Sequence, residues 1–399
     1  MQLNDHVWHR SCALALTLVA QLTIVAGTAP PLTSAAAHAT AVAHTSTTTS
    51  AEAAARAGAP RAAAPGFVQR SGTRLVLDGQ PYVFTGLNIY NAATASGWCW
   101  YPMVPNNVLG DSLTSIGSGK EAFRAWFFQF EATIDGHRDW SRFDQTLATA
   151  RAHGQRVIAV LVDQWGNCEG WPSVAAGYKN EAWYRDGYRT QPTGPGLPAT
   201  YREWVSEMVT RYRDDPTILA WQLVNEAEDA TTLGGACPAT AAQSLVGFAT
   251  DMAALVKSID SNHLLSLGTI GAGQCGTNAS EYATVHAVSG IDVCEYHDYG
   301  NPTTPVPGDR ANGLTARLRQ CRALGKPLFT GELGLRAGDA DGTLAGRARL
   351  LDAKLRGQFD AGVVGVLVWA WRNRENGGSA TDDYYVGPGD PALTVLGTH

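Results

Sequence analysis

The sequence predicts an α/β protein built as a single (β/α)8 TIM barrel with enlarged loops on its top face, and three observations support this prediction. Short apolar runs alternate with amphipathic stretches of helical period, which is the pattern of βα units that form a parallel sheet. Eight such runs follow residue 82, and eight strands close a barrel of this kind. The chain of 399 residues is 45% hydrophobic and 17% charged, with 43 glycines, which fits a globular domain rich in loops.

The eight strand-like runs are separated in most cases by a helical stretch. They are 83–88, 122–128, 156–162, 217–224, 263–269, 291–296, 327–331 and 363–369. The helical stretches are 140–154, 201–214, 240–260, a segment near 312–324, and 342–362. Within one of them, Trp204, Met208 and Tyr212 recur at every fourth position, which places them on one face of a helix.

A short hairpin is expected ahead of the first barrel strand. Two strand-like runs within 72–86 flank Asp78-Gly79, a dipeptide that suits a tight turn. A doubly wound open sheet is the alternative architecture, but no GxGxxG motif follows the first strand, which disfavours it. No internal repeat or second domain is evident.

The first 65 residues are predicted to lie outside the fold. His6 and Arg10 precede an apolar run at 12–27, and this order is typical of a secretory signal, which we assign to residues 1–39. An uncleaved membrane anchor is the alternative, but the run of about 15 residues is shorter than the ~20 that span a bilayer. Residues 40–65 are mainly Ala, Ser and Thr, which indicates a disordered linker. The folded domain then occupies 66–399.

Cysteine content supports an exported protein. Seven cysteines are present, of which Cys12 lies in the signal, and an even number remains for disulfides. No CxxC pair occurs, so zinc and thioredoxin-like sites are disfavoured. Six cysteines can form three disulfides in 15 different sets of pairs, and we expect the set that joins loops predicted to be neighbours. The expected bonds are Cys99–Cys168, Cys237–Cys275 and Cys294–Cys321.

The charge balance restricts the class of partner. A formal net charge of −6 without any Lys/Arg-rich run argues against nucleic acid or an anionic membrane as the main partner. After signal cleavage we expect no stable membrane insertion. We expect the mature protein to be a monomer.

Polar and aromatic residues gather at the predicted carboxyl ends of the strands, where barrels of this class carry their active sites. They are Asn88, Tyr90, Arg124, Trp126, Asp163, Gln164, Trp165, Asn225, Glu226, His297, Asp298, Tyr299, Glu332, Trp369 and Trp371. Glu226 and Glu332 follow strands four and seven, which lie across the barrel mouth from each other. Two carboxyls facing one gap are the minimum apparatus for glycoside hydrolysis.

The two carboxyls need different protonation states, because one attacks the anomeric carbon while the other protonates the departing oxygen. Arg124 and Tyr299 are suited to keep the nucleophile ionised. An arginine inside an apolar strand also needs a buried anion, which Glu332 would supply. Indoles at the mouth offer flat faces on which sugar rings stack.

This pattern resembles glycoside hydrolase family 5, and the resemblance extends from about Gly66 to the C-terminus. The opening segment GFVQRSGTRLVLDGQPYVFTGLNIYN is most similar to the endo-β-mannanase branch. The resemblance implies that Glu226 is the acid/base and Glu332, in the segment GELG, is the nucleophile. It also implies a site without a metal or organic cofactor.

The resemblance implies substrate contacts as well. It assigns Asn225 to the sugar 2-hydroxyl and Trp369, or alternatively Trp371, to the floor beneath the sugar at the cleavage point. The remaining predicted substrate-binding residues are Asn88, Arg124, Trp165, His297 and Tyr299. Two departures are evident, because the family usually has Pro where Ala227 stands, and the loop DQWGNCEGW (163–171) matches no mannanase pattern.

Each residue also has a purely structural interpretation. Arg124 and His297 could be buried ion-pair or hydrogen-bond partners, and Trp126 and Trp221 are expected to be core residues. The loop residues Trp98, Trp100, Trp165 and Trp171 are either sugar subsites or structural. Glu228 and Asp229 are expected to be solvated loop acids. Glu295 should face the same way as His297, where it would contact substrate or pair with Arg124.

The prediction is a secreted retaining β-glycanase acting on a β-1,4-linked polysaccharide or oligosaccharide, with mannan first and β-glucan second. A retaining mechanism requires the carboxyls to be about 5–5.5 Å apart, and an inverting one about 6.5–9.5 Å. The alternatives are a non-catalytic carbohydrate-binding barrel and an exo-glycosidase or transglycosylase acting on a bacterial glycan.

Overall fold

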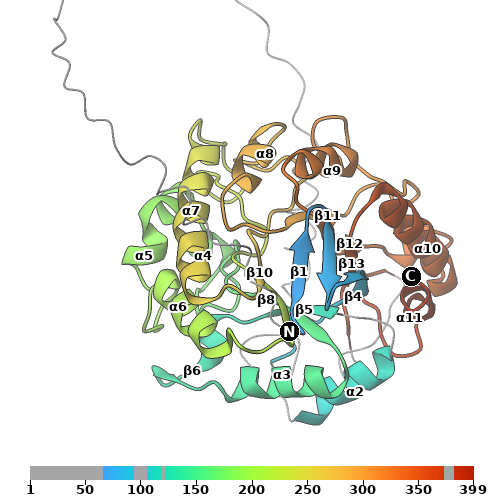
Figure 1. Ribbon diagram of the computed structural model, residues 1–399, viewed down its shortest axis with the longest axis horizontal. Helices are drawn as coiled ribbons and strands as arrows, with labels where there is room; N and C mark the ends of the chain where they lie inside the picture. Colours follow the sequence, from blue (N-terminus) through green and yellow to red (C-terminus); the bar gives the residue numbers. More distant parts are fainter. Residues whose placement is uncertain (1–65, 94–105, 118–121, 373–381) are drawn as a thin grey trace, which may run out of the picture. The chain divides into compact units, whose positions relative to one another are not determined.

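The computed structural model describes residues 66–93, 106–117, 122–372 and 382–399. Within them lies a parallel sheet of eight strands, hydrogen-bonded in the order β10-β9-β8-β5-β4-β13-β12-β11. A parallel bridge between Ser266 at the end of β10 and Val293, just ahead of β11, joins the two edges. The sheet therefore closes into the predicted barrel, with strands in the centre of Figure 1 and helices around them.

Each of the eight predicted runs contains or overlaps one barrel strand. The strands are β4 (Phe84–Asn88), β5 (Ala122–Trp126), β8 (Arg156–Val160), β9 (Ile218–Gln222), β10 (Leu264–Ser266), β11 (Cys294–Asp298), β12 (Leu328–Gly334) and β13 (Gly365–Trp369). Most of their residues are buried, because helices cover the outer face while side chains fill the interior. Continuous apolar runs were therefore a good signal for these strands.

The predicted hairpin forms a three-stranded antiparallel sheet of β1 (Val68–Ser71), β2 (Arg74–Leu77) and β3 (Gln80–Tyr82). Asp78 and Gly79 both have positive φ, 50° and 80°, as a tight primed turn requires. The hairpin packs in one apolar cluster with the first residues of several barrel strands, including Phe84 and Ala122. It therefore closes the amino end of the barrel, opposite the carboxyl ends of the strands.

The helices of the outer layer include all five predicted ones. These are α3 (Ser141–Ala152), α6 (Tyr201–Tyr212), α7 (Ala241–Ile259), α9 (Leu314–Ala323) and α10 (Leu344–Ala361). In α6, Thr200 and Glu203 form a capping box, which satisfies amide groups at the helix start. Trp204, Met208 and Tyr212 are buried along one face of this helix, as their spacing predicts.

Several short elements were not predicted. They are α2 (Asn106–Ile116), η2 (Gln129–Ala132), β6 (Thr133–Ile134), β7 (His137–Arg138), α4 (Val174–Gly177), η3 (Trp183–Gly187), α5 (Tyr188–Thr190), α8 (Glu281–His286), η4 (Ala337–Asp339) and α11 (Pro391–Leu396). Most of them have too few turns to show a helical period. Among the described residues, none of the helices has the length and apolar character that crossing a membrane requires.

Two of the three expected disulfides lie in the described residues. Cys237 is bonded to Cys275 and Cys294 to Cys321, as predicted. Cys168 is also disulfide-bonded, and its expected partner Cys99 lies outside the described residues. Trp98, Trp100, the signal at 1–39 and the linker at 40–65 lie outside them too.

Replacing both Cys237 and Cys275 with serine is expected to lower the free energy of unfolding by about 2–4 kcal/mol, because the disulfide restricts the conformations of the unfolded chain. The two residues are 38 positions apart. Denaturant titration of the oxidised proteins measures the difference. Equal unfolding free energies for the variant and the wild type would contradict this assignment of the bond as stabilising.

Candidate active site

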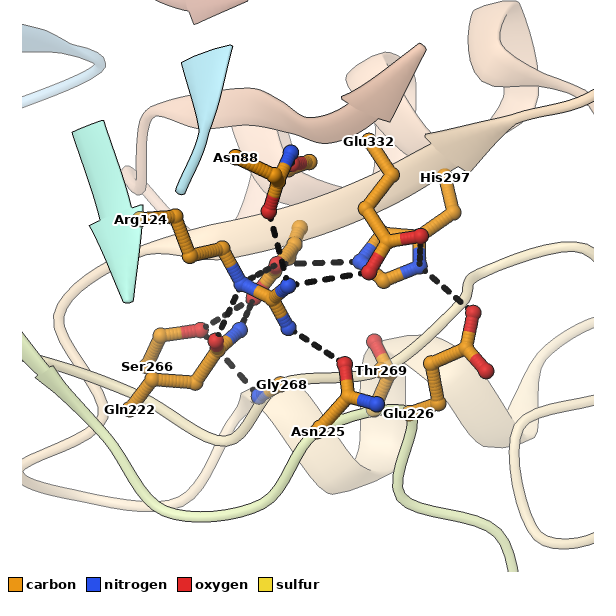
Figure 2. A network of polar contacts seen from close by, with 12 residues as sticks. Asn88, Arg124, Gln222, Asn225, Glu226, Ser266, Gly268, Thr269, His297 and Glu332 are labelled. Carbon is orange, nitrogen blue, oxygen red and sulfur yellow. Dashed lines mark hydrogen bonds and ion pairs between the residues drawn. The ribbon is translucent and has the colours of Figure 1, made fainter. Parts of the chain in front are cut away.

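The carboxyl ends of the barrel strands carry a cluster of buried polar side chains (Figure 2). It contains Asn88 at the end of β4, Arg124 on β5, Asn225 and Glu226 in the segment after β9, His297 on β11 and Glu332 on β12. Each of these six side chains is at most 3% exposed. The structure thus brings together residues that are up to 244 positions apart in the chain (332 − 88).

Glu332 accepts hydrogen bonds from a residue on β5 and from the residue that follows β11. Its Oε1 accepts from Arg124 Nη1 at 2.9 Å, so the expected ion pair is formed. Its Oε2 accepts from the Tyr299 hydroxyl at 2.6 Å. A carboxylate held by a guanidinium and a phenol has a fixed direction and a stabilised negative charge.

The Arg124 guanidinium also fixes three neutral side chains. Nε donates to Gln222 Oε1 at 2.7 Å, and Nη1 donates to Asn88 Oδ1 at 3.0 Å. Nη2 donates to Asn225 Oδ1 at 2.5 Å. Asn88 also donates from Nδ2 to the Gly331 carbonyl at 2.9 Å. Asn88 is fully buried, and these bonds connect it to Arg124 and Gly331; its contact with substrate stays a prediction.

Asn225 is oriented from both ends of its amide. Its Oδ1 accepts from Arg124, and its Nδ2 donates to Asp163 Oδ1 at 2.8 Å. This pair of contacts distinguishes the amide oxygen from the amide nitrogen. Asp163 was noted at a strand end but was not among the predicted site residues, although an acid directly after a buried strand was the available signal.

Glu226 accepts hydrogen bonds from two side chains of the site. Its Oε1 lies 2.8 Å from His297 Nδ1, and its Oε2 accepts from Trp165 Nε1 at 2.8 Å. Trp165 therefore contacts the Glu226 carboxyl itself. One carboxylate oxygen of Glu226, one of Glu332 and one ring nitrogen of His297 all lie within 4.8 Å of one another.

Three acidic groups surround His297. Burial alone would lower the pKa of the imidazole, but the charge of Glu332 and the hydrogen bonds to Glu226 and Glu295 raise it to about 10. The ring is therefore an imidazolium at neutral pH. A metal ligand must be a neutral imidazole, so a metal ion held by Glu226, His297 and Glu332 would have to displace the ring proton.

The two carboxyls respond differently to their surroundings. Burial opposes ionisation of Glu226, but the hydrogen bond and charge of His297, followed by the Trp165 hydrogen bond, lower its pKa. Burial raises the pKa of Glu332, and the charge of Glu226 raises it further. The charges of His297 and Arg124 and the hydrogen bond from Tyr299 lower it, but by less in total. Because each charge raises the pKa of the other group, the two titrate as a pair.

The backbone around Glu226 explains why Ala227 stands where proline is usual. The Ala227 amide donates to the Gly268 carbonyl at 2.8 Å, and proline has no N–H to make this bond. Glu226 itself has a φ of 62°. Gly268 admits no side chain, since a Cβ there would lie 1.7 Å from the Val224 carbonyl oxygen. The loop that carries Glu226 is thereby fastened to the end of β10.

The segment GELG belongs to β12 (Leu328–Gly334) rather than to a turn. Both of its glycines leave room for neighbours. A Cβ at Gly331 would lie 2.0 Å from Glu295 Oε1, and one at Gly334 would lie 2.3 Å from the Tyr299 ring. The glycines therefore allow side chains of β11 and the residue after it to reach Glu332.

The tryptophans divide between the site and the core. Trp369 is partly buried and stacks on Tyr90 with ring centres 5.3 Å apart. Trp371, the predicted alternative to it, is 4% exposed and packs in the main core cluster. Trp126 and Trp221 are buried, as predicted, although Trp126 also contacts Tyr90 at the site.

The prediction that Glu228 and Asp229 are solvated was wrong. Glu228 is partly buried and accepts a hydrogen bond of 2.5 Å from Tyr178. Asp229 is fully buried, because its segment packs against the disulfide loop and its amide donates to the Cys275 carbonyl at 3.0 Å. Burial raises the pKa of Asp229 to about 6. No local pattern in the sequence indicates this packing, because it depends on the loop after β10.

Comparison with known proteins identifies the family of this chain. Residues 203–301 match the family model described as GH family 5 beta-mannosidase-like. A relative from Oryza sativa subsp. japonica, mannan endo-1,4-beta-mannosidase 1, is 30% identical over 312 residues, which cover 67% of this chain and 68% of the relative. The chain belongs to glycoside hydrolase family 5. As a family 5 protein it is an O-glycosyl hydrolase, as the sequence predicted.

Other family 5 proteins match a larger part of the chain. The probable mannan endo-1,4-beta-mannosidase F of Neosartorya fischeri is 25% identical over 356 residues, or 80% of this chain and 71% of the relative. The endo-1,4-beta-mannanase structure from Rhizomucor miehei superposes with a TM-score of 0.61 at 19% identity, covering 83% of this chain and 97% of that one. The structural likeness supports the barrel fold.

Replacing Ala227 with proline is expected to destabilise the family 5 domain by about 1–3 kcal/mol, because the buried Gly268 carbonyl loses its donor. The Glu226 carboxyl would also shift, so kcat should fall. Ala227→Gly is the matched control, since it retains the N–H. Denaturant titration and initial rates measure both effects, and a proline variant as stable and active as the glycine control would refute the explanation.

Proposed function

We propose that this chain is a retaining endo-β-mannanase that cleaves β-1,4-linked mannan by double displacement. The observation that carries the proposal is the placement of one carboxylate oxygen of Glu226 within 4.8 Å of one of Glu332. An inverting enzyme keeps its carboxyls about 6.5–9.5 Å apart to admit a water between sugar and base. Oxygens at most 4.8 Å apart are compatible with the separation of about 5–5.5 Å between the carboxyl groups of a retaining enzyme, which supports direct attack by one carboxyl on the sugar.

In the first step, the Glu332 carboxylate attacks the anomeric carbon and forms a glycosyl ester, while Glu226 protonates the departing oxygen. Arg124 and Tyr299, which donate to Glu332, orient its oxygens before attack. In the second step, Glu226 removes a proton from water, and the water attacks the anomeric carbon from the face that the leaving group vacated, which breaks the bond to the Glu332 oxygen. The sugar is released with its original β configuration.

The substrate-binding roles rest on the same geometry. Asn225, held by Arg124 and Asp163, is placed beside Glu226 to bind the sugar 2-hydroxyl. Trp369 presents a partly exposed ring at the end of β13, and we assign it the floor beneath the sugar. Trp165 donates to Glu226, so its indole bounds the leaving-group side.

Mannan is the proposed substrate because the relatives from rice and Neosartorya fischeri carry mannan endo-1,4-beta-mannosidase names. Exo-action is a second candidate, since the matching family model is described as beta-mannosidase-like. β-Glucan is the second polysaccharide to test. Secretion is proposed from the signal at 1–39, and disulfides in the domain support an oxidising compartment. We also propose that the barrel at 66–399 functions as a monomer.

Azide distinguishes the roles of the two carboxyls by the configuration of the trapped product. With Glu226→Ala and an activated aryl mannoside, azide should enter from the water side of the ester and give the β-glycosyl azide. With Glu332→Ala, azide should take the place of the nucleophile and give the α-glycosyl azide. Without azide, turnover of either variant should fall by several orders of magnitude. NMR of the products identifies the anomer, and reversed configurations would exchange the two assignments.

Initial rates on mannan, β-glucan, xylan and galactan test the substrate. Mannan is expected to give the highest kcat/KM, with a broad mixture of oligosaccharides at early times because an endo-enzyme cuts internal bonds. Chromatography of the first products measures their lengths. Release of mannose or one short product from the outset indicates exo-action, and binding of mannan without turnover of any substrate would favour a binding protein.

A further inference from the structure

Glu295 is a third carboxyl of the active site, located beneath the two catalytic ones. It lies on β11, two residues before His297, and is 0% exposed. Its Oε1 is 3.1 Å from His297 Nε2, and its Oε2 accepts from Ser266 Oγ at 2.9 Å. Gln222 Nε2 also donates to Oε2. Glu295 is thereby held rigidly against the far side of the His297 ring.

The His297 ring is placed between two buried carboxyls. Nδ1 faces Glu226 Oε1 at 2.8 Å, and Nε2 faces Glu295 Oε1 at 3.1 Å. A neutral imidazole has one N–H and one lone pair, whereas the doubly protonated ring donates from both nitrogens. Two carboxylates at opposite nitrogens therefore match the cation. When the ring carries a single proton, a Glu295 carboxylate favours keeping that proton on Nε2.

The chain reserves space for this arrangement. A Cβ at Gly331 would lie 2.0 Å from Glu295 Oε1 and 3.0 Å from His297 Nε2. Gly331 directly precedes Glu332 in the strand, so the nucleophile strand itself accommodates the contact. Any other residue at position 331 would push the Glu295 carboxyl away from the ring.

We propose that Glu295 is a positioning residue that lets His297 store, on Nδ1, the proton that Glu226 delivers to the departing oxygen. This inference rests on the proposed glycosidase function. It also accounts for the lowered pKa of Glu226, which is otherwise unexpected for an acid catalyst. In the empty site the proton resides on the imidazolium, one hydrogen bond away from the carboxylate that uses it.

The proton transfers balance over one turnover. The Nδ1 proton of His297 moves to Glu226 Oε1, which leaves a neutral ring with its remaining N–H directed at Glu295. Glu226 then gives that proton to the glycosidic oxygen as the bond to the leaving group breaks. In the second step Glu226 accepts a proton from the attacking water, and this proton returns to Nδ1. No group is oxidised or reduced.

Charged groups from every neighbouring element contribute to the protonation of His297. Glu226 after β9 and Glu332 on β12, the latter 3.6 Å from Nδ1, favour the imidazolium. Arg124 on β5 opposes it, although this guanidinium is itself paired with Glu332 and lies 3.9 Å from Glu295. The pKa of His297 is raised to about 10 by this surrounding, in agreement with storage of a proton at neutral pH.

The test is the pH dependence of kcat/KM on mannan for the full chain and its Glu295→Gln variant. The glutamine amide carries no charge, so His297 should lose its proton at lower pH. The alkaline limb of the pH profile of kcat/KM should therefore move down by about one pH unit or more, which corresponds to a tenfold change in proton affinity. KM at pH values below that limb should change little. The Glu295→Asp variant, which retains the charge, should move the limb back toward that of the wild type.

Asp298→Asn is the matched control, because it removes a buried carboxyl from the same strand. Asp298 accepts from Lys354 Nζ at 2.8 Å and Gln358 Nε2 at 2.8 Å, away from His297. The alkaline limb of the pH profile of the Asp298→Asn variant should coincide with that of the wild type, even if the variant is less stable. A uniform loss of rate in Glu295→Gln, with the limb unmoved, would show a structural role only and overturn the proposal.

A measurement independent of turnover separates this inference from the proposed function. Imidazole ¹⁵N shifts of His297, identified by their loss in His297→Asn, report protonation of both ring nitrogens. At about pH 9.5, between the two expected pKa values, most wild-type molecules should have two N–H groups on this ring and most Glu295→Gln molecules only one. Identical titrations would refute the role of Glu295, whereas failure of the wild type to cleave any β-glycan would refute only the glycosidase function.

Discussion

The active site depends on one buried cation. Arg124 lies inside the barrel, 1% exposed, and a charge in such a place is costly unless acceptors and an opposite charge surround it. Asn88, Gln222, Asn225 and Glu332 provide the acceptors. They come from β4, β9, the segment after β9 and β12, so the guanidinium joins elements from three parts of the barrel. The acceptors that Arg124 requires therefore also fix the position of the Glu332 carboxyl.

The barrel could be predicted from the sequence because its strands are short, apolar and regularly spaced. Buried parallel strands produce continuous hydrophobic runs, and the eight runs needed no tertiary information to be counted. Short helices such as α8 (Glu281–His286) were missed, since six residues do not show a period. The Asp78-Gly79 turn was predicted because its conformation depends on the two residues themselves.

The grouping of polar side chains at the carboxyl ends of the strands was also predictable in outline, since polar residues interrupt the apolar runs there. What could not be predicted was how the side chains share their hydrogen bonds. Asn88 accepts from Arg124 and donates to the Gly331 carbonyl, and its place at a strand end did not indicate these partners. Asp229 was expected in solvent but is covered by a loop far along the chain. Both outcomes depend on residues distant in sequence, and no local pattern encodes them.

The hairpin at the start of the domain covers the amino end of the barrel, opposite the active site. Gly66, the first described residue, is held by Arg156 Nη1, which donates to its carbonyl at 2.9 Å, and by Asp78, which accepts from its amide at 2.8 Å. Arg156 is the first residue of β8, so the chain enters the domain at the closed end. Attaching the protein to a bead or a second module through its amino terminus would therefore leave the catalytic mouth free for a long polymer.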